Sequence, residues 1–340
     1  MTDDTLLETR ELKTYFRRST NVLDTILGRR QSYVNAVDGV SLSLGEREIT
    51  GIVGESGCGK STFLKTVGGL IEPTEGRVLF LGEPLSGMDR ARKLEFHNDV
   101  QMIFQDPYNS LDPKMSVRQT LREPLIIHGL DDHEERIHRV LERVELNPPE
   151  RFIGQLPNAL SGGERQRVSI ARALILEPRV LLADEPVSML DVSTQASILE
   201  MLRSLSDEMD FSIFYVSHNI STVAYLCERI NVMYLGRVIE SGPTMDVIDD
   251  PKHPYAHALI NAVPIPDPYF GREFTDLEGS TPDPIDLGEG CRFRGRCPER
   301  MEICERTPRQ ITTEDGREVA CHLYYDHEET LEREETIKTD

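Results

Sequence analysis

The sequence from residue 54 to residue 61 reads Gly54-Glu55-Ser56-Gly57-Cys58-Gly59-Lys60-Ser61 and fits the pattern G-x-x-x-x-G-K-[ST] at every fixed position. The apolar run at residues 49–53 predicts a buried strand before it, and residues 62–67 predict the start of a helix after it. Glycines in such a turn let the backbone direct its N–H groups onto phosphate oxygens, and the helix N-terminus favours the same anion. The stretch therefore predicts a nucleotide site.

The lysine and serine of this loop have separate expected roles. Lys60 is expected to reach the β- and γ-phosphates, and the Ser61 hydroxyl to ligate Mg²⁺. The alternative is a merely structural glycine-rich turn with an incidental lysine. A dinucleotide fingerprint is a weak match, because Thr62 stands where its third glycine should be. The expected nucleotide contacts are Gly54, Glu55, Ser56, Gly57, Cys58, Gly59, Lys60, Ser61 and Thr62.

Length and charge set broad limits on function. With 340 residues, the chain has room for one large domain and a smaller one. Its net charge of -21 argues against a broad nucleic-acid surface. No stretch approaches the roughly 20 apolar residues of a membrane span, and the acidic residues 1–4 do not resemble a signal peptide. We expect a cytosolic protein. The acidic, lysine-poor composition suits a high-salt cytoplasm or an ordinary acidic protein equally well.

The remaining pattern predicts an α/β fold around a mixed or parallel core sheet. Residues 6–12 predict an edge strand and residues 35–44 a half-buried strand, together forming a small antiparallel sheet beside the nucleotide core. Residues 100–104 predict another strand, ending in a polar loop at 105–113. Helical spacing from 117 to 146 predicts a helical subdomain at about 106–176.

The segment Leu160-Ser161-Gly162-Gly163-Glu164 lies directly before a predicted helix at residues 165–176. Free N-terminal amides at the start of a helix can bind an anion, so the segment implies a second anion-binding end. Taken alone, it would more often be an N-cap and turn.

Asp184 and Glu185 follow a short apolar run at residues 180–183, which predicts a central parallel strand. Two carboxylates at the end of a core strand are costly unless they hold a metal ion and a water. Asp184 is therefore expected to bind Mg²⁺, and Glu185 to polarise the attacking water. His218 follows the next predicted strand and is expected at the same sheet edge.

These motifs, in this order, resemble those of the ATP-binding subunit of an ABC transporter. The resemblance runs from about residue 6 to about residue 262. Four further stretches resemble the oligopeptide/dipeptide permease ATPases: residues 101–111, 191–196, 253–255 and 290–298. The long stretch between Phe16 and Val37 and the Gly57-Cys58-Gly59 form of the loop are more like the second, F-type ATPase of that system than its D-type partner. ATP and Mg²⁺ are the ligands that this resemblance implies.

The resemblance also assigns roles in the chain's own ATP site. Phe16, or failing that Tyr15, would stack on adenine. Gln105 would sense Mg²⁺ and the attacking water, and would pass the nucleotide state to a membrane subunit. His218 would contact the γ-phosphate from the same chain.

Other roles imply a partner. Ser161 and Gly163, with Gly162 between them, would contact the γ-phosphate bound to an opposite ATPase subunit, and Asp191 would lie across that interface. Met189 stands where the family usually has alanine, but no catalytic group is lost by this departure.

The family implies a membrane assembly at the cytoplasmic face. Its parts would be a second ATPase subunit, most simply in a heterodimer, two integral membrane permease subunits and, indirectly, an extracellular solute-binding protein. Peptides are the usual cargo, while some relatives carry sugars or nickel. A soluble ABC ATPase of translation or DNA repair is the alternative. Nucleic acid is not expected as a partner.

Four cysteines lie near the C-terminus with the spacing C-x5-C-x6-C-x16-C, namely Cys291, Cys297, Cys304 and Cys321. Four thiolates could ligate a [4Fe-4S] cluster or Zn²⁺, and related permease ATPases favour the cluster. Reduced thiols are the third possibility. We expect an ATP-binding domain at 1–262, an extension at 263–325 between proline-rich linkers at 264–268 and 281–290, and an acidic tail at 326–340.

Overall fold

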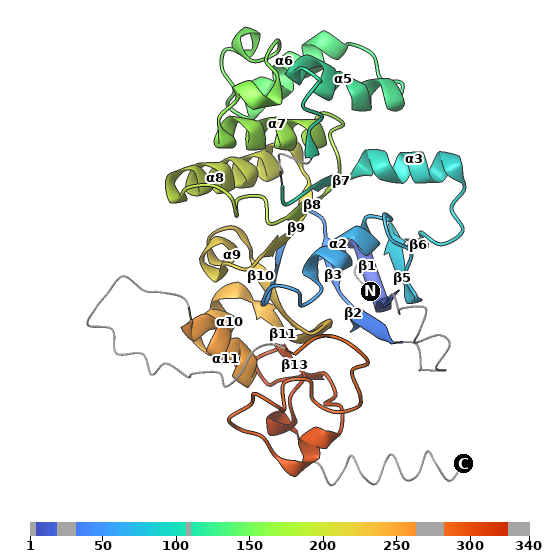
Figure 1. Cartoon of the computed structure of the whole chain (residues 1–340), viewed down its shortest axis with the longest axis vertical. Coiled ribbons are helices and arrows are strands. Elements are labelled where there is room, and N and C mark those ends of the chain that lie inside the picture. Colours follow the sequence, from blue (N-terminus) through green and yellow to red (C-terminus); the bar gives the residue numbers. More distant parts are fainter. Residues whose placement is uncertain (1–4, 19–31, 107–109, 263–281, 326–340) are drawn as a thin grey trace, which may run out of the picture.

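The computed structural model describes residues 5–18, 32–106, 110–262 and 282–325 (Figure 1). The predicted linker at 264–268 and the acidic tail at 326–340 lie outside the described residues, as do residues 1–4 and most of the polar stretch between the first two strands. Within the described ranges, no helix is both long and apolar enough to cross a membrane.

An eight-stranded sheet forms the centre of the molecule, in the order β12-β13-β11-β10-β4-β9-β8-β7. Its strands are β4 (Ile49–Val53), β7 (Val100–Ile103), β8 (Val180–Asp184), β9 (Ser212–Ser217), β10 (Arg229–Tyr234), β11 (Arg237–Pro243), β12 (Ile311–Thr312) and β13 (Glu318–Val319). The strands from β10 to β7 run parallel, and the others add antiparallel pairs. Because β4, β8 and β9 are buried on both faces, they read as apolar runs. The expected mixed sheet with a parallel core is confirmed.

A second, antiparallel sheet packs beside this core. It has the order β2-β1-β5-β6, with β3 paired to β1. Its strands are β1 (Thr5–Arg17), β2 (Tyr33–Val40), β3 (Ser43–Gly45), β5 (Glu75–Phe80) and β6 (Glu83–Pro84). The prediction of an edge strand at 6–12 was wrong, because β1 has partners on both sides. The single strand predicted at 35–44 is divided into β2 and β3.

The helices fall into two groups. The helices α5, α6 and α7 lie together at the top of Figure 1, and the others lie around the strands below them. The helices are α2 (Lys60–Val67), α3 (Arg90–Asp99), α5 (Val117–Ile127), α6 (His133–Arg143), α7 (Gly162–Leu174), α8 (Val192–Met209), α9 (Ile220–Leu226), α10 (Thr244–Asp249) and α11 (Pro254–Asn261). The helical spacing at 117–146 corresponds to two helices. Gly129 and Asp132, both at positive φ, separate them.

The C-terminal extension, residues 282–325, is continuous with the core rather than appended to it. Its strand β13 pairs with β11 of the core sheet. The supposed linker at 281–290 also pairs: Asn35 N–H donates to the Pro284 carbonyl at 2.8 Å, and Asp286 N–H to the Tyr33 carbonyl at 3.0 Å. Part of the predicted linker at 281–290 is thus hydrogen-bonded to β2. Polar, proline-rich composition did not prevent this backbone from pairing with the exposed edge of β2.

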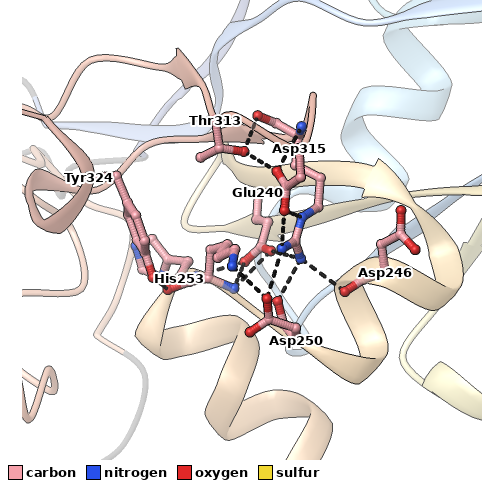
Figure 2. A network of polar contacts seen from close by, with 9 residues as sticks. Glu240, Asp246, Asp250, His253, Thr313, Asp315 and Tyr324 are labelled. Carbon is pink, nitrogen blue, oxygen red and sulfur yellow. Dashed lines mark hydrogen bonds and ion pairs between the residues drawn. The ribbon is translucent and has the colours of Figure 1, made fainter.

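A polar network around the buried Arg317 joins the extension to the core (Figure 2). The guanidinium donates to the Asp315 carboxylate at 2.6 Å and to the backbone carbonyls of Asp250 at 2.6 Å and Asp246 at 2.9 Å. Its Nη1 lies 3.6 Å from the carboxylate of Glu240 on β11, a side chain with no exposed surface. Glu240 also accepts the His253 backbone N–H at 2.7 Å.

We expect Arg317→Met to destabilise the fold by about 3–5 kcal/mol, because it leaves the buried Glu240 carboxylate without its cation. Chemical unfolding measures this free energy. The control is Arg92→Met, which removes an exposed arginine that pairs with Glu83 and Glu95. Such surface pairs contribute about 0–1 kcal/mol. Equal losses in the two variants would contradict the anchoring role of Arg317.

His253 predicts a specific dependence of stability on pH. Burial lowers the pKa of His253 from 6.5 to about 3, because the enclosed imidazolium would lose its hydration. Below pH 6.5 the unfolded chain therefore takes up a proton that the folded chain does not, and stability falls as the pH falls. The free energy of unfolding should fall by about 1 kcal/mol less between about pH 7 and about pH 5.5 in His253→Gln than in the wild type. Identical slopes would refute this assignment.

Candidate functional site

The phosphate loop connects β4 to α2 through two tight backbone approaches. At Gly59, the residue before α2, φ is 109° and an added Cβ would lie 1.9 Å from the Ala36 carbonyl oxygen of β2. At Gly54, an added Cβ would lie 2.2 Å from the Met233 carbonyl oxygen of β10. Both positions require glycine, since a side chain there would displace backbone. The loop is thus wedged between strands of both sheets.

Lys60 is buried at the start of α2 and is held by the loop itself. Its Nζ donates to the Gly54 carbonyl at 2.7 Å and to the Glu55 carbonyl at 3.0 Å. The buried Cys58 lies beside it, and burial raises the pKa of this thiol. The ammonium group is therefore held by the first two residues of the loop. The last residues of the loop lead into α2, whose N-terminal amides would bind a phosphate.

Ser61 and Asp184 form the site where a metal ion is expected. The Ser61 hydroxyl donates to Asp184 Oδ1 at 2.9 Å, from the first turn of α2 to the end of β8. Burial raises the pKa of Asp184, while the hydrogen bond from Ser61 opposes that rise. A hydroxyl and a buried carboxylate are hard oxygen donors of the kind that Mg²⁺ prefers, so these residues fit the expected ion.

Glu185 contacts two of the other expected catalytic side chains, Gln105 and His218. Gln105 Nε2 donates to Glu185 Oε2 at 3.0 Å, and His218 Nδ1 lies 2.9 Å from the same oxygen. The other oxygen, Oε1, has no hydrogen-bond partner among the described residues. Glu185 itself has φ of 47°, a strained conformation that its N–H bond to the Val216 carbonyl at 2.9 Å helps to hold. The three side chains come from the ends of three adjacent strands, β7, β8 and β9.

The two aromatic residues proposed for adenine lie in different surroundings. Tyr15 donates its hydroxyl to the Asp38 carboxylate and is partly buried. Phe16, the next residue of β1, is 40% exposed. Because successive strand residues point to opposite faces, only Phe16 presents an open ring for stacking. This geometry favours the first of the two choices.

Ser161 and Asp191 both cap helices at the surface. The Ser161 hydroxyl accepts the Glu164 N–H at 3.3 Å, and the Glu164 carboxylate accepts the Ser161 N–H at 2.8 Å, which completes a capping box for α7. Asp191 accepts the Thr194 N–H at 3.1 Å at the start of α8. Gly163 lies against α8, where an added Cβ would be 2.8 Å from Thr194. The N-cap interpretation of this segment is confirmed, and its exposed position leaves it open to a partner.

The four cysteines of the extension are free thiols, of which Cys291, Cys304 and Cys321 are buried. Within the ranges that the structure describes, no three His, Cys, Asp or Glu side chains are arranged to hold a metal ion. The predicted iron-sulfur or zinc site is therefore not supported by this geometry. Burial raises the pKa of Cys297 and of Cys321 to about 11, so isolated thiols here would stay protonated.

Two side chains touch the phosphate loop that no sequence motif had indicated as its neighbours. The buried Tyr255 of α11 accepts the Glu55 N–H at 2.9 Å, and Arg296 of the extension forms an ion pair with the Glu55 carboxylate. Both residues lie within stretches that carried the family resemblance. Proximity to the loop was invisible in the sequence, since each is separated from Glu55 by some two hundred residues of chain.

Known proteins of similar sequence belong to the family that the motifs indicated. The family described as "ABC transporter" matches residues 37–188, and that described as "Oligopeptide/dipeptide transporter, C-terminal region" matches residues 239–304. The oligopeptide transport ATP-binding protein AppF of Bacillus subtilis is 40% identical over 94% of this chain and 98% of that protein. The oligopeptide transport ATP-binding protein OppF of Salmonella typhimurium is 44% identical over 81% of this chain and 83% of that protein.

Solved structures share the fold. The protein cbiO1 of Clostridium perfringens, part of the ABC transporter complex cbiONQ, superposes with a TM-score of 0.61 at 28% identity, over 73% of this chain and 92% of that one. The ATP-binding cassette MJ0796, in a dimeric post-hydrolysis state bound to ADP and Pi, gives a TM-score of 0.61 at 29% identity, over 70% and 99% of the two chains.

Fold, phosphate loop and carboxylate pair thus define an ATPase of the ABC class, a class that binds and hydrolyses ATP. More narrowly, this chain belongs to the oligopeptide/dipeptide transport ATP-binding family of ABC transporters, as its motifs had indicated.

Proposed function

We propose that the chain is the ATP-hydrolysing subunit of an importer for oligopeptides or dipeptides, working at the cytoplasmic face of the membrane. The observation that carries the proposal is the convergence of Gln105, Glu185 and His218 at the sheet edge beside the phosphate loop. Residues 1–262 would form the ATP-binding domain, with 263–325 as an extension that serves it and 326–340 as a tail. Peptide transport is the activity that the names of the similar proteins carry.

Hydrolysis would use the chain's own groups as follows. Lys60 and the amides of the phosphate loop bind the phosphates, and Ser61 and Asp184 would hold Mg²⁺, with Gln105 nearby. When bound, Mg²⁺ would neutralise charge that develops on the phosphate oxygens. Glu185 Oε1 accepts a proton from the attacking water. Gln105 and His218, both on Oε2, keep that carboxylate oriented.

A second ATPase subunit would complete each site. The surface around Asp191 carries two exposed apolar side chains, Met189 at 58% and Val192 at 81% exposure, close to the Ser161 cap of α7. Exposed apolar groups beside the N-terminus of a helix suit a partner that brings a triphosphate. We therefore place Ser161, Gly162 and Gly163 on the γ-phosphate of the partner's ATP, most simply in a heterodimer.

The membrane subunits would dock near Gln105. A hollow between the end of α2 and α5 is lined by Leu70, Phe104 and Ile127, and Ile126 beside it is also exposed. The apolar side chains of this hollow suit a cytoplasmic segment of a permease subunit, and its closeness to β7 would let Gln105 report the nucleotide state. The loop at residues 107–109, part of this expected link, lies outside the described residues.

Affinity purification from membranes of the native host tests the proposal. The tagged chain should bring down two integral membrane proteins and a second ATPase, and Ile127→Asp should lose the membrane proteins. Met245→Asp, which changes an exposed side chain on α10, is the matched control. Recovery of ribosomes or DNA-repair factors in place of membrane proteins would favour a soluble ABC ATPase. The ligand of the associated binding protein would decide between peptides and the alternative cargoes, sugars or nickel.

For the four cysteines we propose a [4Fe-4S] cluster, with Zn²⁺ as the alternative. The support is the donor set: four thiols on one short extension, three of them buried. Iron, zinc and acid-labile sulfide are to be measured on anaerobically purified protein. The absence of both metals would leave the thiols as structural residues.

A further inference from the structure

The extension makes a direct, charged contact with the phosphate loop. Arg296 Nη1 lies 3.0 Å from Glu55 Oε2, and its Nη2 donates to Glu55 Oε1 at 3.1 Å. The pair is therefore bidentate, and the arginine side chain is only 10% exposed. Charge-assisted bidentate pairs fix geometry more strongly than ordinary hydrogen bonds. A residue of the extension thus holds the side chain of the second residue of the loop.

The backbone of Glu55 is also fixed, on both sides of its Cα. Its N–H donates to the Tyr255 hydroxyl at 2.9 Å, and its carbonyl accepts from Lys60 Nζ at 3.0 Å. The Tyr255 ring packs at 5.5 Å from the buried Phe293 of the extension. The extension therefore supports Glu55 through the aromatic contact as well as through Arg296.

A second arginine of the extension braces the other end of the loop. The side chain of Arg292 is only 6% exposed and donates to the Asp38 carboxylate on β2. The same strand carries the Ala36 carbonyl against which Gly59 packs. The loop thus lies between two contacts that the extension maintains, one near its first residue and one near its last glycine.

We propose that Arg296 is a positioning residue for ATP binding: through Glu55 it holds the phosphate loop in the conformation that receives the phosphates. The proposal rests on ATP binding at this loop, the activity of the family. Arg296 would act through Glu55 and not by direct contact with the nucleotide. Its loss should weaken the binding of ATP equally in the ground state and the transition state, which raises KM and leaves kcat unchanged.

Arg296→Met in the full chain tests the proposal, because methionine keeps the apolar stem and removes the guanidinium. The Kd for a fluorescent ATP analogue and the KM for ATP should both rise about tenfold, which lies within the range of interaction energies found between neighbouring residues. The kcat should stay within about twofold of the wild-type value. Arg296→Lys should recover part of the affinity. The control, Arg300→Met, removes an exposed arginine that pairs with Glu305 at 2.8 Å inside the extension.

A double-mutant cycle separates positioning from general destabilisation. Glu55→Gln combined with Arg296→Met should be no weaker in ATP binding than the worse single variant, because both remove the same contact. The proposal would be overturned if the losses of ATP affinity in the two single variants multiplied in the double variant. An unchanged KM in Arg296→Met, or a fall confined to its kcat, would also overturn it, as would an equal change in Arg300→Met. The wild type is titrated first, so failure of the ATP site itself would appear there and not in the comparison between variants.

Discussion

Replacement of Glu185 by glutamine is expected to lower ATP hydrolysis by about 10²–10⁴-fold, the usual contribution of a general base, while ATP binding is retained. The amide keeps the size of the side chain and can still accept from Gln105 Nε2, so the local geometry persists. It can no longer take a proton from water. Phosphate release measures the turnover, and equilibrium titration with ATP measures the binding.

The matched control is Glu208→Gln, the same chemical change at an exposed position that pairs with Arg143 on the surface. Its turnover should equal that of the wild type. Because Glu185→Gln retains ATP, gel filtration in the presence of the partner subunit should also show an ATP-dependent larger species. Near-normal hydrolysis in Glu185→Gln would remove Glu185 from its assigned role, whatever the oligomeric state.

Replacement of Gly59 by alanine is expected to weaken ATP binding by about 100-fold, because a displaced loop loses charge-assisted hydrogen bonds to the phosphates, each of which contributes about 1.5–3 kcal/mol, and about 2.8 kcal/mol corresponds to that factor. The added Cβ would lie 1.9 Å from the Ala36 carbonyl oxygen, and a φ of 109° is unfavourable for any residue but glycine. Since backbone lies on both sides of the contact, the loop itself must move. Titration with ATP measures the loss, and circular dichroism checks that the chain still folds.

Gly129→Ala separates backbone strain from displacement of the loop. Gly129 also has positive φ, at 65°, but an added Cβ there meets no atom within 4 Å. Left-handed backbone costs an alanine about 1–2 kcal/mol, so this variant should lose stability and keep its ATP affinity. If Gly59→Ala bound ATP as tightly as Gly129→Ala does, the loop would not depend on its close approach to β2.

The candidate ATP-site residues could be predicted from the sequence because each motif is local and carries its own chemistry. A glycine-rich turn between an apolar strand and a helix predicts a phosphate loop wherever it occurs. Parallel strands then bring their carboxyl ends to one edge, so Asp184, Glu185 and His218 were expected together before their distances were known. The spacing of the cysteines, by contrast, predicts ligands only if the chain folds them around one point, and among the described residues no three such side chains are arranged to hold a metal ion, so the cluster stays a proposal.

Sequence alone thus determined the ATPase family, the parallel core and the candidate site residues, because short-range patterns encode the strands, the turns and the glycines between them. Tertiary structure alone decided that β1 lies inside its sheet, that residues 284–286 pair with β2, and that Arg296 reaches Glu55. These contacts join segments far apart in the chain. They form because a buried charge and an unpaired strand edge each need a partner, and only the folded chain supplies it.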